Sequence, residues 1–493
     1  MNEWIAFVLP PATGLVGMRL SALLLGRELE VRFGFGLRFA LGLALGMLVF
    51  SQLILLTALA GLAAAGLLAW VVLLGGVIEL GRLAPSARAA IHEFQFQPGH
   101  LWLLALIPAL YWLFVFGRLS TLEGTMEFDA NAFWVFKAKI FYLVQGAQLR
   151  DALQQSDIAY AHLDYPALVP CLYTFTYGAV GEVDEFVNKV WPFWMLATLG
   201  IAVLSVARIV QRPHPLPCFT VVILLYLPGL LRYVRWEGGT LPLVFFVSMS
   251  AIVMMVALVG EDEWAHAATL LLLAGGAATK QEGIVFAAAG SSVMLAYGWW
   301  RGWLFHRRFW LAALVAAACM VPYFLLRLSH PMPHPESGWW HGLVEAPGEV
   351  FRRFPQVLFL LTGGPFFDLK FFHWRVPDKD HLYWDGTWHG IESFNNPHLS
   401  LVPVLTLIMF LYLLWTQPRS RIALSLLLLV LIGMLSILAL TIASLPLFRP
   451  DIGEFLIVTA EGRHSYPFYT AWFLGTVVVW LTSKADPSPV SAK

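Results

Sequence analysis

The sequence predicts an all-α polytopic membrane protein with about 13 transmembrane helices. Of its 493 residues, 59% are hydrophobic and only 13% are charged, whereas a soluble chain carries about 25% charged residues because its surface must be solvated. Apolar runs of roughly 16–24 residues recur along the chain, as a hydrocarbon core about 30 Å thick requires. Short polar or proline-containing breaks separate these runs, which excludes the alternating pattern of an outer-membrane barrel.

Charge and cysteine content exclude other classes of protein. The 31 basic and 31 acidic residues give no net charge, so no nucleic acid is expected as a partner. Cys171, Cys218 and Cys319 lie far apart in apolar segments. This spacing indicates small buried side chains, and it fits neither a disulfide framework nor a metal site.

The spans are placed from the apolar runs and oriented by the Lys and Arg residues of short loops, which mark the cytoplasm. Pro10-Pro11 is expected to interrupt the first span, and the helices at 266–279 and 283–298 are expected to be short. The expected spans are 4–25, two helices within 39–81, then 101–118, 188–207, 217–231, 241–259, 266–279, 283–298, 310–328, 399–415, 422–443 and 467–483.

This orientation places the N-terminus outside and a tail, 484–493, in the cytoplasm. Residues 120–165 and the large loop 329–398 then lie outside, and 299–309 lie inside. Within the first outer segment, the amphipathic stretch from Asp129 to Arg150 predicts an interfacial helix. The apolar run 166–180 is too short to cross, which favours a half-inserted helix that returns to the outer face.

Acidic, histidine and aromatic residues gather on the predicted outer face, and few charged residues fall at mid-membrane. Because a charge at the bilayer centre is costly, this distribution favours a catalytic cleft at the outer surface over an ion pathway. The first group is Glu127 and Asp129, which could bind a divalent cation or supply a general base. Their alternative role is to cap the helix that begins near Asn131. Lys137 and Lys139 follow and point to different faces of a helix.

Two further groups lie beside helix ends. The residue before a proline must be extended, so His162 and Asp164, which precede Pro166, would be presented on one side of the chain. The alternative is that they belong to an ordinary helix-entry turn. Lys280 and Glu282 interrupt an otherwise nearly uncharged stretch. They form either a salt-bridged hairpin tip or a pair that grips a lipid phosphate.

The last two groups lie nearer the C-terminus. The loop 329–398 contains seven of the 14 histidines, but their spacing fits no zinc pattern. Its Trp339 and Trp340 could anchor the loop at the bilayer surface or stack on a sugar. Arg463 and His464 could contact a phosphate, to which the arginine fork is suited, or pair with neighbouring loop charges.

Several of these residues together resemble the GT-C glycosyltransferases. Asp129 with Trp134 and Lys137, followed by the helix entry Tyr165-Pro166, looks like the first external loop of these enzymes. They are multi-spanning proteins that use polyprenyl-phosphate sugars, and protein O-mannosyltransferases and lipid A aminoarabinose transferases are among them.

Two later motifs are similar to those of the same superfamily. Thr279-Lys280-Gln281-Glu282-Gly283 resembles its Thr-Lys-x-Glu-Gly turn, and the segment 461–467 resembles its motif before the last helix. The resemblance covers about residues 100–483. Many relatives carry a Lys or a second Pro at the helix entry, where this chain has Asp164-Tyr165 and Ala167. The charge for phosphate recognition would then have to come from Lys280, Arg235 or Arg463.

The resemblance implies a GT-C-like helical bundle in the plasma (inner) membrane, with an extracytoplasmic active site. In this reading, 1–95 holds extra helices of unknown role, 96–328 is the core, 329–398 is an external loop and 399–483 holds the C-terminal helices.

The implied activity is inverting transfer of a sugar from a polyprenyl-phosphate donor to a glycan, lipid or protein acceptor. Asp129, beside Glu127, would be the catalytic base, and a divalent cation is an open question because the pair is not a strict Asp-x-Asp. The donor phosphate would be held by Lys280, Arg463, Arg235 and His464. The acceptor cleft would be lined by His162, Asp164, Tyr165, Glu237, Glu282, Trp339 and Trp340.

Two other functions fit the same pattern in part. A surface-glycan polymerase or ligase would act on diphosphate-linked chains. A lipid-linked sugar flippase or transporter would show inverted repeats and charges near the midplane, and no convincing internal repeat is seen.

Overall fold

The structure is a computed structural model that describes part of the chain, and the expected spans 101–118 and 422–443 lie mostly outside the described residues. Among the described residues all regular structure is helical and no strand occurs, which agrees with the all-α prediction. The described residues are 2–26, 33–93, 130–144, 146–153, 165–209, 216–226, 234, 238–329, 348, 397–416 and 470–481, with isolated positions within 104–115 and 424–435.

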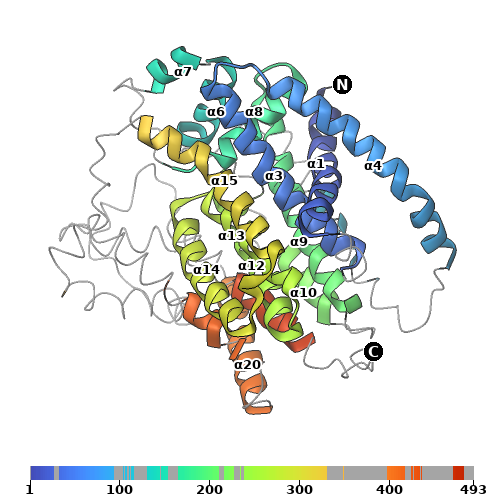
Figure 1. The fold of residues 1–493 in the computed structure, drawn as a ribbon. Coiled ribbons are helices and arrows are strands. Elements are labelled where there is room, and N and C mark those ends of the chain that lie inside the picture. The colour runs from blue at the N-terminus through green and yellow to red at the C-terminus, as the bar shows by residue number, and fades with distance from the viewer. Residues whose placement is uncertain are drawn as a thin grey trace, which may run out of the picture.

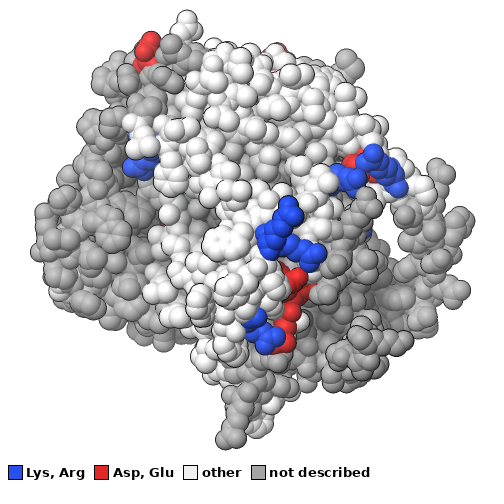
Figure 2. Space-filling view, viewed as in Figure 1, with Lys and Arg blue, Asp and Glu red and all other residues white. Residues whose placement is uncertain are grey.

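Seven of the described helices are long and apolar enough to cross a membrane. The protein is therefore an integral membrane protein, and the described surface on the face shown in Figure 2 is largely uncharged, as lipid contact requires. The total of about 13 spans stays a prediction. The seven segments are Glu3–Leu25, Phe35–Leu59, Ala65–Pro85, Glu185–Val206, Thr240–Gly260, Gln281–Arg301 and Arg307–Leu328.

The first three helices, α1 (Asn2–Leu25), α3 (Phe35–Leu59) and α4 (Ala65–Glu93), pack closely together. A Cβ added at Gly17 would lie 1.8 Å from the carbonyl oxygen of Gly42. Only glycine allows the backbones of α1 and α3 to approach in this way. Helix α3 also contacts α8, α9, α13 and α15, so these N-terminal helices pack directly on the rest of the bundle (Figure 1).

The predicted interruption of the first span is wrong, because α1 continues through Pro10 and Pro11. A proline has no amide hydrogen to donate to the carbonyl four residues earlier, and for Pro11 that carbonyl belongs to Phe7. The indole nitrogen of Trp194 donates to the Phe7 oxygen at 2.9 Å. A neighbouring helix therefore satisfies the group that the proline leaves unpaired, as is common in membrane helices.

Helices α6 to α8 gather near the N-terminal end of α1 (Figure 1). The predicted interfacial helix over 129–150 is divided in two, because Val144 is extended at φ −123° and ψ 134°. The π-turn η2 (Ala130–Val135) leads into α6 (Phe136–Leu143), and α7 (Gly146–Leu153) follows. The short helix α8 (Leu168–Val180) has only 13 residues and is buried against α3, α4 and α6. Its half-insertion in the membrane stays a prediction.

Helix α13 (Glu263–Ala277) lies among the helices that precede and follow it in the sequence. It packs against α12 (Thr240–Gly260), α14 (Gln281–Arg301) and α15 (Arg307–Ser329). The prediction that 283–298 is a short helix is wrong, since α14 has 21 residues and includes the polar positions at both ends. The remaining elements are η4 (Glu185–Val187), α9 (Val190–Ile209), α10 (Leu216–Tyr226), η5 (Trp303–Phe305), α20 (Pro397–Thr416) and the helix Thr470–Leu481.

Candidate functional site

The turn between α13 and α14 places Lys280 and Glu282. Lys280 occupies the N-cap position of α14 with extended backbone, φ −149° and ψ 164°. The hydroxyl of Thr279 donates to the carbonyl of Gly276 at 2.6 Å, which closes the end of α13. A Cβ at Gly283 would lie 1.9 Å from the Gly276 oxygen. Thr279 and Gly283 therefore shape this tight turn.

Lys280 and Glu282 are both buried, each being 8% exposed. The Nζ atom of Lys280 lies 3.6 Å from Oε1 of Glu282, which is within ion-pair range but longer than a hydrogen bond. The turn is thus salt-bridged, yet it is enclosed by the bundle and is no solvated hairpin tip. Removing two charges from water is costly, so their burial calls for a reason other than stability.

A second buried cation lies beside two stacked rings. Lys137 is 1% exposed, and its Nζ atom lies 5.1 Å from the ring centroid of Trp134 and 5.7 Å from that of Tyr165. The two rings stack 5.9 Å apart at an interplanar angle of 24°. A cation over an aromatic face is attracted by the ring quadrupole, most strongly where water is excluded.

Gly239 joins these two groups into one site. A Cβ at Gly239 would lie 2.7 Å from Cζ2 of Trp134 and 3.0 Å from Cγ of Lys280, so both side chains pack on the backbone of this residue. The amide of Leu168 also donates to the carbonyl of Ala278 at 3.1 Å, which ties the entry of α8 to the end of α13. We refer to Trp134, Lys137, Tyr165, Gly239, Lys280 and Glu282 as the Lys280 site.

The structure brings together the predicted site residues that it describes. Tyr165 meets Trp134 and Lys137, and Lys280 with Glu282 adjoins them through Gly239. Ten other predicted site residues lie outside the described residues. They are Glu127, Asp129, His162, Asp164, Arg235, Glu237, Trp339, Trp340, Arg463 and His464.

The two lysines of α6 do face different ways. Lys137 enters the Lys280 site, whereas Lys139 forms an ion pair with Glu185 and its side chain is 32% exposed. Sequence reasoning missed Gly239. Its signal is a pair of glycines, Gly238-Gly239, directly before a long apolar helix, because two adjacent glycines there mark a close approach of another segment.

A separate polar cluster lies where α8 ends and α9 begins. The Asp184 carboxylate accepts a hydrogen bond from the Phe186 amide at 2.9 Å. Burial raises the pKa of the Asp184 carboxyl above its usual value of 3.8. The Phe186 amide lowers this pKa, and the negative charges of Glu182, Glu3 and Glu185 raise it.

No group of three or more His, Cys, Asp or Glu side chains is arranged to hold a metal ion in the described part of the chain. The candidate pair for a divalent cation, Glu127 and Asp129, lies outside that part.

Comparison of the chain with protein-family models, with curated proteins and with solved structures gave no match. The resemblance to GT-C enzymes rests on the motifs alone.

Proposed function

We propose that the protein is an inverting membrane glycosyltransferase that moves a sugar from a polyprenyl-phosphate donor to an acceptor at the outer face of the plasma membrane. The observation that carries this proposal is the pairing of two buried lysines, Lys137 and Lys280, with the stacked rings of Trp134 and Tyr165. Buried cations suit a phosphate anion, and aromatic faces suit a sugar ring.

The roles of the described residues follow from their positions. Lys280 contacts the donor phosphate, and Glu282, 3.6 Å away, holds the ammonium group in place. Lys137 is held over the Trp134 and Tyr165 rings and adds positive charge near the leaving phosphate. Stabilising charge that develops in the transition state is usually the largest catalytic contribution.

The reaction itself is assigned to Asp129, which directly precedes the first residue of η2 in the sequence. The acceptor hydroxyl oxygen attacks the anomeric carbon while its proton passes to the Asp129 carboxylate. The bond between that carbon and the phosphate oxygen breaks, and its electron pair leaves with the polyprenyl phosphate. Arg463, with Arg235 and His464, is proposed to share the phosphate with Lys280.

The test is single-turnover transfer by purified protein in nanodiscs, with a panel of radiolabelled polyprenyl-phosphate sugars. Asp129→Asn keeps the size of the side chain but cannot take the proton, so transfer should fall by about 10²–10⁴-fold. Donor affinity should change little. The matched control is Glu127→Gln. Transfer should fall only mildly if Glu127 just shapes the loop. If the pair binds a divalent cation, transfer should fall severely and added cation should suppress the loss.

Three outcomes would contradict the proposal. Wild-type transfer by Asp129→Asn would end the mechanism, and the base would be sought at Asp164 or Glu237. Transfer from diphosphate-linked donors only would indicate the polymerase or ligase. Movement of the intact lipid-linked sugar across a vesicle membrane, without transfer, would indicate the flippase.

A further inference from the structure

The opposite end of α14 carries an aromatic collar. Exposed rings surround the point where α14 ends, η5 forms a single turn and α15 begins. They belong to Trp299, Trp300, Phe305 and Trp310, which are 69%, 65%, 77% and 60% exposed. Tryptophan rings concentrate at the level of the lipid headgroups. Since α14 and α15 are both candidate spans, this end lies at a membrane–water interface.

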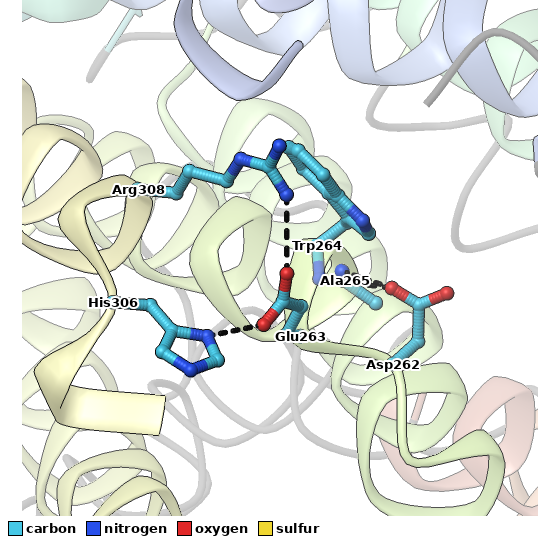
Figure 3. Close-up of polar contacts among 6 residues, drawn as sticks. All are labelled: Asp262, Glu263, Trp264, Ala265, His306 and Arg308. Atoms are coloured by element: carbon cyan, nitrogen blue, oxygen red, sulfur yellow. Dashed lines mark hydrogen bonds and ion pairs between the residues drawn. The ribbon is translucent and has the colours of Figure 1, made fainter. Parts of the chain in front are cut away.

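Basic side chains lie among these rings, with their carboxylate partners on the inner side. Glu263 accepts hydrogen bonds from His306 and, at 3.1 Å, from Arg308, whose guanidinium group lies 3.4 Å over the ring of Trp264 (Figure 3). Arg301 pairs with Glu261 at 2.8 Å. The Glu263 side chain is 27% exposed, against 43% for Arg308 and 49% for His306. The outer layer of the cluster is therefore basic.

Arg307 differs from its neighbours. Its side chain is exposed, and no carboxylate of the described residues lies within ion-pair distance of it. Glu263 is already shared by the residues on either side, His306 and Arg308. The guanidinium of Arg307 is thus available to an anion from outside the protein.

An apolar track leads from this arginine along α15. Leu314, Val321, Phe324 and Leu328 are 66%, 48%, 55% and 79% exposed, and the helix is long enough to cross the hydrocarbon core. A ligand that fits both features has an anionic head at Arg307 and hydrocarbon chains that lie against α15.

We propose that this surface, formed by Arg307, the collar and the exposed face of α15, binds an anionic phospholipid. The phosphodiester of the lipid contacts Arg307, and its acyl chains pack on α15. Charge complementarity selects the anionic headgroup, because the choline cation of a zwitterionic lipid would oppose the basic outer layer. This inference does not depend on the proposed transferase activity, which concerns the opposite end of α14.

The experiment measures lipid binding to the full chain in detergent, by native mass spectrometry and by titration with short-chain lipids. Wild-type protein should prefer phosphatidylglycerol to phosphatidylcholine, and Arg307→Gln should weaken phosphatidylglycerol binding about fivefold. Phosphatidylcholine binding should be unchanged. The matched control is Arg82→Gln, because Arg82 is also an exposed arginine near the end of a candidate span (Ala65–Pro85) but is paired with Glu79.

Added salt should reduce the preference in wild-type protein, since the contact is exposed. Equal binding of the two lipids by wild-type protein would overturn the proposal, as would unchanged phosphatidylglycerol binding in Arg307→Gln. The last measurement tests whether soluble glycerol phosphate binds to the same site. If it occupies the site as well as phosphatidylglycerol does, the acyl chains contribute nothing and the ligand is no lipid.

Discussion

The two ends of the α13–α14 pair hold their charges in different ways. Lys280 is 8% exposed and lies 3.6 Å from Glu282, whereas the Arg308 side chain is 43% exposed and hydrogen-bonds to Glu263 at 3.1 Å. Exposed pairs of the second kind contribute little energy, cost little to form and can serve an interface. A buried pair with loose geometry is not explained by stability, since the desolvation cost can exceed the attraction. The burial of the Lys280–Glu282 pair therefore supports the phosphate-binding role proposed for this end.

The largest effect is expected from breaking the buried pair. Lys280→Met removes the cation that lies 3.6 Å from the buried Glu282 carboxylate, which should cost about 3–5 kcal/mol of stability. The double variant Lys280→Met/Glu282→Gln removes both charges and should recover most of that loss. Neither should bind polyprenyl phosphate as wild type does, while Lys280→Arg should keep part of the affinity. Thermal unfolding and lipid titration in detergent measure the two properties separately.

A double variant that regains stability and also binds polyprenyl phosphate normally would show that Lys280 is no phosphate ligand. Loss of expression in Lys280→Met and Lys280→Arg alike would favour a purely structural turn.

A smaller effect is expected at the opposite end. Glu263→Gln weakens the pairs with His306 and Arg308, and because these groups are partly exposed the loss of stability should be about 1 kcal/mol or less. The loss should shrink further in high salt, which screens exposed charges. Thermal unfolding at low and high salt measures this. A loss as large as that of Lys280→Met would mean that the two ends do not differ as their exposure indicates.

The smallest effect is a pH dependence at Asp184. Its raised pKa means that the folded protein binds this proton more tightly than the unfolded chain does. The contribution to stability is therefore fully present below the unfolded pKa and is lost as pH rises through the folded pKa. Asp184→Asn keeps an acceptor for the Phe186 amide and has no carboxyl to ionise. It should be more stable than wild type at pH 7, and the difference should vanish as pH falls toward 3.8. Equal unfolding midpoints at pH 7 would contradict this.

Local sequence patterns predicted much of the helical framework. Spans expected at 241–259 and 310–328 correspond to α12 (Thr240–Gly260) and α15 (Arg307–Ser329), because an apolar run of span length is a local property. The turn at Lys280 was predicted for a similar reason. Its glycine and threonine act on residues only a few positions away.

Two features of the structure depend on contacts with distant segments and could not be predicted. Pro10 and Pro11 are tolerated in α1 because Trp194, 187 positions from Phe7, satisfies the carbonyl that Pro11 leaves unpaired. The importance of Gly239 depends on Trp134 and Lys280, which approach it from other parts of the chain. The residues adjacent in the sequence do not reveal which distant residues make these contacts.

The sequence by itself determined that the chain is an integral membrane protein and where its main helices run, because each span must bury its own apolar side chains and pair its own backbone groups. Only the tertiary structure decided that Lys137, Lys280 and the Trp134–Tyr165 stack meet in one buried site. Their meeting depends on which helices pack together. Between membrane helices that choice is made by close packing and polar contacts over long sequence separations, since lipid is as apolar as the side chains themselves.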